Sequence, residues 1–167
     1  MEINFLILVL ATLVPLAIGF IWYNPKFGFG KAWMKATGMT EENAKGANMG
    51  LVFGLTTLFS FFIAFIMQSI VIHQFGTFGL LSQQPDFSDP NSESALMWKR
   101  FLELYGNSYR TFKHGAFHGT LTGIFFVLPI IGINALFERR GFKYIAINAG
   151  YFTVCLALMG GIICGFS

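Results

Sequence analysis

The chain has 167 residues, of which 54% are hydrophobic and only 11% are charged, and its formal net charge is +3. Soluble domains carry about 25% charged residues, so a water-soluble fold of this size could not cover its surface with charged groups. This composition excludes an ordinary soluble domain and predicts an all-α integral membrane protein whose main partner is the lipid bilayer. The basic residues lie at the ends of apolar runs and form no patch, so no nucleic acid partner is expected.

The apolar runs predict a single membrane domain, residues 1–167, that contains four spanning helices packed as a bundle. The predicted spans cover about residues 3–23, 49–73, 114–136 and 144–166. We interpret the first run as a retained span rather than a signal peptide, because no Lys or Arg precedes it and no small-residue cleavage site follows it. This span ends in an aromatic belt and a helix stop, Trp22-Tyr23-Asn24-Pro25.

The connection between the second and third spans, residues 74–113, is the longest polar region. Its first half has the Gln, Asp, Asn and Pro content of turns and loops. Its second half, about residues 92–106, begins with the helix-capping residue Ser92 and carries apolar residues at helical spacing. These apolar residues are Ala95, Trp98, Phe101, Leu102 and Tyr105. We predict an extra amphipathic helix that lies in the membrane interface beside the four-helix bundle.

Lys and Arg residues are unequally divided between the two ends of the predicted spans. The first and third connections hold seven of them: Lys26, Lys31, Lys35, Lys45, Arg139, Arg140 and Lys143. The opposite side holds four: Lys99, Arg100, Arg110 and Lys113. The excess predicts that the first and third connections lie in the cytoplasm, and that both termini and the 74–113 loop lie outside a bacterial inner membrane.

Three passages together resemble a bacterial membrane family known as domain of unknown function 1761. The first is Gly19-Phe20-Ile21-Trp22-Tyr23-Asn24-Pro25, which continues through Gly30-Lys31-Ala32-Trp33-Met34 to Gly38-Met39-Thr40. The others are Asn134-Ala135-Leu136-Phe137-Glu138 and Ile147-Asn148-Ala149-Gly150-Tyr151. The resemblance implies a helical, membrane-embedded protein. It implies no activity, because none is established for the family.

Small residues recur at every fourth position in the last three predicted spans. They form rows at Gly46, Gly50 and Gly54, at Gly115, Gly119 and Gly123, and at Ala157, Gly161 and Gly165. Residues four apart share one helix face, so each row is a groove in which another backbone can approach closely. We predict that these rows pack helices together, either within the chain or between copies of it.

The three histidines form the first candidate site. His73 closes the second span, and His114 and His118 open the third span at the same end of the bundle. Two histidines at positions i and i+4 can bind one metal ion from a single helix face, and a third could complete an open site. An acidic residue of the outer loop could add a ligand, the candidates being Asp86, Asp89, Glu93 and Glu103. The alternatives are interfacial histidines that bond to neighbouring helices, or a proton relay.

A second candidate site consists of polar residues toward the cytoplasmic side: Asn24, Asn134, Glu138, Asn148 and Tyr151. Polar groups at membrane depth are costly when unpaired, so they indicate either a function or a hydrogen-bond network. Asn134 and Glu138 lie one helical turn apart, and Asn148 follows the short turn and could meet them. We favour hydrogen bonds that close the helical hairpin. Glu138 could instead pair with a neighbouring basic residue, or the set could line a substrate or ion site.

The sequence contains no nucleophile–base set and no nucleotide-binding fingerprint, so we expect no enzyme, no catalytic residues and no resident cofactor, a metal ion excepted. Three functions remain open. The first is a packing or accessory subunit of a homo-oligomeric or hetero-oligomeric membrane assembly. The second is a small channel or carrier with a polar site around Glu138, Asn134 and Asn148. The third is an outer-face metal-binding or sensing protein that uses His73, His114 and His118.

Overall fold

The computed structural model describes residues 4–40, 42–43 and 46–167, and these residues form helices and no strands. In chain order the helices are α1 (Phe5–Trp22), α2 (Gly30–Thr37), α4 (Met49–Val71), α5 (Gln74–Leu81), α6 (Glu93–Tyr105), α7 (Phe112–Thr122), the π-helical segment η1 (Gly123–Val127), α8 (Leu128–Phe137) and α9 (Phe142–Phe166). Helices α7, η1 and α8 run on as one long element, Phe112–Phe137.

Four helices are long and apolar enough to cross a membrane, which confirms the predicted membrane bundle. They are α1, α4, the continuous Phe112–Phe137 element and α9. Large apolar side chains cover their outer surface: Phe20 and Phe125, for example, are each 75% exposed. Such a surface is stable in a bilayer and would not be stable in water.

Short polar side chains fix where three of these helices begin. The carboxamide oxygens of Asn4 and Asn48 accept hydrogen bonds from the third backbone N–H that follows each residue, at 3.3 and 3.1 Å. The Thr111 hydroxyl accepts in the same way from the backbone N–H of His114, at 3.2 Å. These bonds satisfy N–H groups that a helix start otherwise leaves without a partner.

The tightest helix pair is α7 with α9, and glycines make it possible. A Cβ on Gly119 would overlap the backbone of Leu156, and a Cβ on Gly115 would overlap the backbone of Gly160. At Gly123 it would lie 2.6 Å from the Thr153 hydroxyl. The glycine row of the third span therefore lies directly against α9, where only a hydrogen atom fits.

The small-residue row of α9 faces the same helix. Ala157 contributes its Cα to the tight contact at Gly119, and Gly161 and Gly165 both lie against Phe112. The row on the second span is different, because a Cβ on Gly54 would meet nothing within 4 Å and one on Gly50 would meet only the nearby side chain of Asn48. In the described chain, Gly46, Gly50 and Gly54 thus pack against no other helix.

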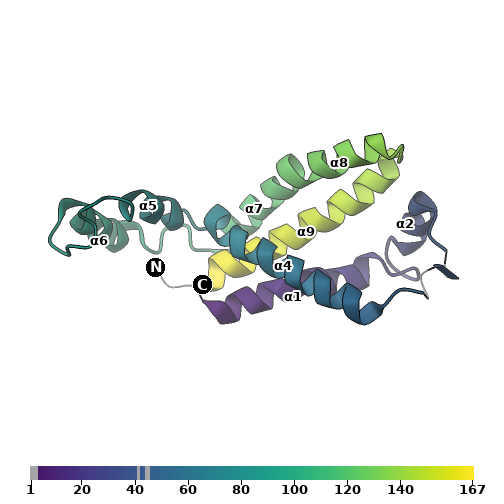
Figure 1. The fold of residues 1–167 in the computed structure, drawn as a ribbon, viewed down its shortest axis with the longest axis horizontal. Coiled ribbons are helices and arrows are strands. Elements are labelled where there is room, and N and C mark those ends of the chain that lie inside the picture. Colours follow the sequence, from purple (N-terminus) through teal and green to yellow (C-terminus); the bar gives the residue numbers. More distant parts are fainter. Residues whose placement is uncertain (1–3, 41, 44–45) are drawn as a thin grey trace.

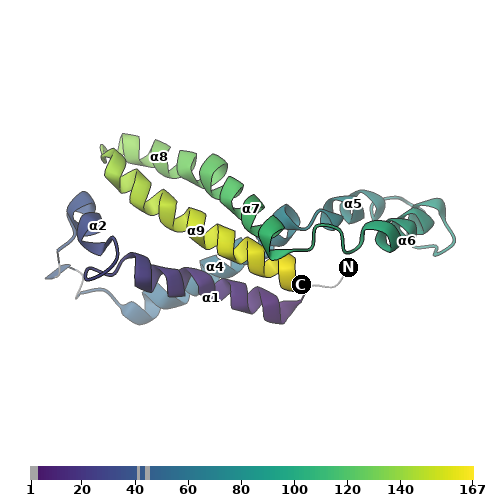
Figure 2. The ribbon, with the colours of Figure 1, turned by 180° about the vertical axis from the view of Figure 1, so that it is seen from behind.

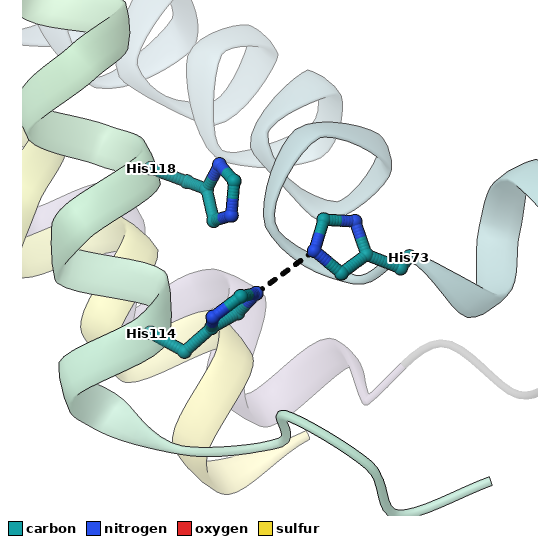
Figure 3. Close-up of side chains that lie close together, drawn as sticks. All are labelled: His73, His114 and His118. Atoms are coloured by element: carbon teal, nitrogen blue, oxygen red, sulfur yellow. Dashed lines mark hydrogen bonds between the residues drawn. The ribbon is translucent and has the colours of Figure 1, made fainter. Parts of the chain in front are cut away.

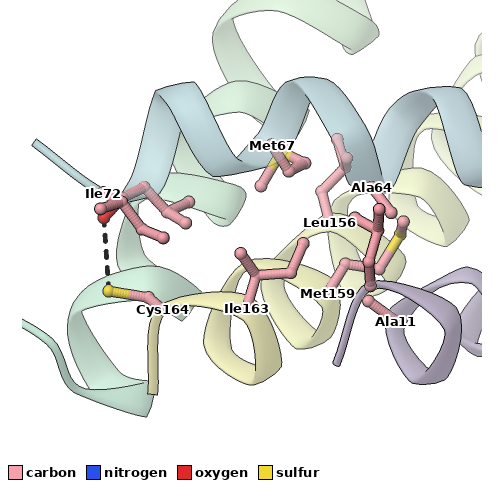
Figure 4. Close-up of a cluster of buried hydrophobic side chains, with 10 residues drawn as sticks. Ala11, Ala64, Met67, Ile72, Leu156, Met159, Ile163 and Cys164 are labelled. Carbon is pink, nitrogen blue, oxygen red and sulfur yellow. Dashed lines mark hydrogen bonds between the residues drawn. The ribbon is translucent and has the colours of Figure 1, made fainter. Parts of the chain in front are cut away.

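The buried core lies at the end of the bundle that holds the C-terminus. Figure 4 shows side chains of α4 and α9 meeting there, with Ala11 of α1 beside them. Met67 is 1% exposed, and Met159 and Ile163 are 0% exposed. The Cys164 thiol donates to the Val71 carbonyl at 3.3 Å, so it closes this end of the core as a buried hydrogen-bond donor.

The spanning helices cross near this core and separate toward the other end. Figures 1 and 2 show α4 and α9 diverging toward the end of the molecule that carries α2. The α5–α6 hairpin projects from the opposite end, beyond the ends of the spanning helices. The predicted amphipathic helix at 92–106 is present as α6, and its Trp98 packs against Phe78 of α5 with ring centroids 5.3 Å apart.

Two short helices were not predicted from the sequence. Residues 74–81, read as part of a loop, form α5, and residues 30–37, read as a polar connection, contain α2. Helices of eight residues are not stable alone, so packing decides whether they form. Helix α5 packs on α6 through Phe78, and α2 packs its Trp33 on Tyr23 with ring centroids 5.4 Å apart.

Candidate metal centre

The three histidines come from two separate parts of the bundle. His73 lies between α4 and α5, directly after Ile72, the C-cap residue of α4. His114 and His118 lie one turn apart in the first part of α7, whose start is fixed by the Thr111 cap. Because residues four apart share one face of a helix, both α7 histidines face the junction between α4 and α5.

The imidazole rings converge on one point, as Figure 3 shows. The Nε2 atoms of His114 and His73 lie 2.9 Å apart, within hydrogen-bond distance. His118 completes the group, with its ring centroid 5.0 Å from that of His73 and 4.5 Å from that of His114. One ring nitrogen from each histidine lies within 4.8 Å of the others. We call His73, His114 and His118 the histidine cluster.

This geometry is close to that of a metal site with three nitrogen ligands. Metal–nitrogen bonds of about 2.0–2.1 Å at tetrahedral angles separate two ligand nitrogens by about 3.3 Å. The His73–His114 pair would therefore have to open by a few tenths of an ångström. The widest pair, at no more than 4.8 Å, would have to close by up to about 1.5 Å. Three histidines leave a fourth position open for water or a fourth ligand. Imidazole is a common ligand for zinc, copper, nickel and iron.

The acidic residues predicted as extra ligands do not join the cluster. Asp86 accepts a hydrogen bond from the Ser94 hydroxyl at 2.8 Å, and Glu103 pairs with Arg100 at 3.1 Å. Within the described residues, the group able to hold a metal ion contains the three histidines alone. All three ligands are therefore neutral when they bind, and the ion would keep its full positive charge.

Two residues beside the histidine cluster were not predicted from the sequence to belong to the site. Tyr109 has a left-handed backbone with a φ of 61°, and its ring centroid lies 5.2 Å from that of His114. Gln74 is 3% exposed, and its amide group donates to the carbonyls of Tyr105, Gly106 and Ser108 at 2.7, 3.2 and 3.1 Å. Gln74 thus ties the α4–α5 junction, and with it His73, to the end of α6. Neither role could be predicted from the neighbouring sequence, because each depends on contact with a segment elsewhere in the chain.

The polar residues predicted to lie toward the cytoplasmic side do not all meet at one site. Asn148 accepts from the Tyr23 hydroxyl at 2.9 Å and donates to the Tyr144 carbonyl at 2.8 Å, so it joins α9 to α1 rather than meeting Asn134 and Glu138. Asn134 is exposed. The predicted hairpin network is therefore replaced by a contact between α9 and the C-cap of α1.

The other members of this set have separate partners. The carboxylate of Glu138 lies 3.7 Å from the guanidinium of Arg140, which is the basic pairing considered above. Asn24 caps a turn by accepting from the backbone N–H of Lys26 at 2.8 Å. The hydroxyl of Tyr151, 8% exposed, donates to the Pro15 carbonyl at 2.7 Å. These contacts hold helices together, and two members of the set, Asn148 and Tyr151, also line one cavity between α1, α2, α4 and α9.

The fold and the cluster together define a class: an all-helical integral membrane protein with four spanning helices and three converging histidines at one end. The chain belongs to the family described as "Protein of unknown function (DUF1761)", whose family model matches residues 6–164. The match confirms the resemblance carried by residues 19–40, 134–138 and 147–151. No curated protein and no solved structure matches the chain.

Proposed function

We propose that the protein binds a divalent transition metal ion, of the zinc class, through His73, His114 and His118. The observation that carries this proposal is the convergence of one ring nitrogen from each histidine to within 4.8 Å of the others. The role that this convergence supports is ion binding, because three neutral imidazole nitrogens are the ligands of a metal site. The open fourth position suits an ion that enters and leaves, as sensing or transfer requires.

A packing role alone would not need this arrangement. A buried or interfacial histidine in a helix bundle needs a single hydrogen-bond partner, and one pair would supply it. Here a third ring, that of His118 in the next turn of α7, lies beside the other two. If any two of the three rings were protonated, two positive charges would lie close together and repel each other. A metal ion removes that penalty, because it binds all three rings in their neutral form.

The excess of Lys and Arg at the other end of the bundle supports an orientation for the site. Seven of these residues fall between α1 and α4 or between the end of α8 and the first turn of α9, against four between α4 and the first turn of α7. On this basis the histidine cluster belongs on the outer face of a bacterial inner membrane, together with both termini. The metal ion would then bind from the outer side of that membrane.

Metal analysis of the purified protein tests the proposal directly. The affinity tag is removed, the protein is washed with chelator, and one equivalent of Zn²⁺ is added before desalting. We expect about one ion per chain in the wild type. The His114→Ala/His118→Ala double variant should retain none, and Lys113→Ala, a control from the same turn of α7, should match the wild type. Equal metal content in all three proteins, or none in the wild type, would contradict the proposal.

A second proposed function is that of a packing subunit in a homo-oligomeric or hetero-oligomeric membrane assembly. It is supported by the glycine row of α4, where Gly54 has open space around it although the corresponding row of α7 is fully packed. Helices in lipid associate through such faces. If α4 packs against another subunit, Gly50→Leu/Gly54→Leu should reduce the assembly size measured in mild detergent. Gly132→Leu, at an equally open position on α8, should leave the size unchanged.

A further inference from the structure

A cavity lies between α1, α2, α4 and α9, at the end of the bundle that carries α2 and away from the histidine cluster. Its volume is about 650 Å³, within the range of sites for small organic ligands. Five aromatic side chains line it: Tyr23, Trp33, Phe59, Tyr151 and Phe152. They come from α2, α4, α9 and the C-cap of α1. We call this space the aromatic cavity.

The polar groups that line the aromatic cavity are uncharged. They include the hydroxyls of Thr56 and Ser60 from α4 and the carboxamide of Asn148 from α9. Asn148 uses one of its two amide hydrogens to donate to the Tyr144 carbonyl, which leaves the other for a ligand. None of the described residues that line the cavity is an Asp, Glu, Lys or Arg. A charged ligand would find no counter-charge here, whereas a neutral ligand with acceptor oxygens would find donors.

The depth of these donors argues against an ordinary membrane lipid. Ser60 lies 11 residues beyond the first residue of α4, Met49, which is about 16 Å along the helix axis. Asn148 lies 6 residues beyond the first residue of α9, Phe142, which is about 9 Å. Phospholipid ester groups lie in the interfacial region, outside the hydrocarbon core. Donors this far along the spans suit a lipid-soluble molecule whose oxygens enter the hydrocarbon region.

We propose that the aromatic cavity binds a neutral, ring-bearing lipophile with carbonyl oxygens, of the quinone class. Its flat ring would lie among the side chains of Tyr23, Trp33 and Phe59, since aromatic surfaces prefer stacked or edge contacts. Its carbonyl oxygens would accept from the hydroxyls of α4 and the amide of Asn148. The site is independent of the histidine cluster, because the two lie at opposite ends of the bundle and share no residue.

Trp33 offers a direct measurement, because it lines the cavity and a bound quinone quenches tryptophan fluorescence. For this test the protein is given Trp98→Phe, which removes the distant fluorophore of α6. Adding Trp33→Phe leaves Trp22 as the one tryptophan and defines the background signal to be subtracted. Titration with decylubiquinone in a fixed amount of detergent should give quenching that saturates. Thr56→Phe, which fills the cavity, should weaken the apparent affinity at least tenfold.

The neighbouring position provides the matched control. Thr57 does not line the cavity, and its hydroxyl donates to the Phe53 carbonyl, so Thr57→Phe should quench as the parent protein does. Ser60→Ala removes one donor without adding volume, and should weaken binding even if Thr56→Phe disturbs the fold. The His114→Ala/His118→Ala protein should bind decylubiquinone normally, so failure of the metal proposal leaves this test intact.

Three outcomes would overturn the proposal. Quenching that rises linearly and equally in every variant would report only partitioning into detergent. Saturable quenching that Thr56→Phe and Ser60→Ala leave unchanged would place the ligand elsewhere. A phospholipid that co-purifies in the native mass spectrum, is lost in Thr56→Phe and is not displaced by decylubiquinone would make the cavity a lipid site.

Discussion

The Nε2 atoms of His73 and His114 lie 2.9 Å apart although 41 positions separate the two residues in the chain. At this distance one ring donates a hydrogen that the other accepts, so at least one of the two must be neutral. His118 lies beside them, so three rings that can each accept a proton are held close together. One ring nitrogen from each of these three residues could bind the same metal ion.

Metal binding at the histidine cluster should depend steeply on pH. A histidine must lose its proton to ligate, and its unperturbed pKa is about 6.5. We therefore expect the affinity for Zn²⁺ to fall as the pH falls, by up to about tenfold per pH unit for each histidine that must lose a proton. Calorimetric titration with Zn²⁺ at several pH values between about 5 and about 8 measures how the affinity changes with pH. A pH-independent affinity would argue against imidazole ligands.

Replacing Gly119 by alanine should loosen the α7–α9 pair. The added methyl group would overlap the backbone of Leu156, and backbone cannot move aside as a flexible side chain can. We expect the free energy of unfolding to fall by about 1–3 kcal/mol, the usual cost of overpacking. Unfolding by denaturing detergent, followed by circular dichroism, measures the loss. Gly54→Ala meets nothing within 4 Å and should leave the stability unchanged or raise it slightly.

Tyr151→Phe should destabilise the contact between α9 and α1. The substitution removes only the hydroxyl that donates to the Pro15 carbonyl at 2.7 Å, and it leaves the ring in place. Hydrogen bonds between helices in membranes contribute about 0.6 kcal/mol on average and up to about 1.7 kcal/mol. We expect a loss in that range in the same unfolding measurement. Tyr105→Phe, at a side chain that is 53% exposed, is the control and should have no effect.

The α5–α6 hairpin should lose its fixed geometry in acid. The Ser94 hydroxyl donates to Asp86, and this bond holds the pKa of the Asp86 carboxyl below its ordinary value of 3.8. Because the folded form has the lower pKa, its stabilising effect is fully present above pH 3.8 and is lost as the pH falls through the folded value.

The near-ultraviolet circular dichroism of Trp98, which packs on Phe78 of α5, reports this change. The wild-type signal should decrease below pH 3.8. Asp86→Asn should show a weaker signal already at neutral pH and little further change in acid. Asp89→Asn, which removes a carboxylate that accepts from the backbone of Asn91 and not from Ser94, should keep the wild-type titration. A titration that Asp86→Asn leaves unaltered would assign the acid transition to another group.

Local signals in the sequence were enough to predict the four spans and the amphipathic helix. Helices α4 and α9 start and end close to the predicted limits, because apolar length and caps such as Asn48 act within one helix. Helix α5 was missed because the turn-forming residues at 83–91 caused the whole first half of the connection to be interpreted as a loop. Residues 74–81 are helical where Phe78 packs on Trp98. The partner of Asn148 was also not predicted, because Tyr23 lies at the end of α1, 125 positions away.

The sequence alone therefore determined the class of protein, the approximate bounds of its spans and the helix faces that carry glycine and histidine. These properties depend on composition and on the 3.6-residue helical period, which are local. Only the tertiary structure decided that the α7 glycines meet α9, that His73 reaches His114, and that an aromatic cavity opens between α4 and α9. Each of these depends on how two helices cross, and crossing geometry follows from side-chain packing along the whole interface rather than from any one segment.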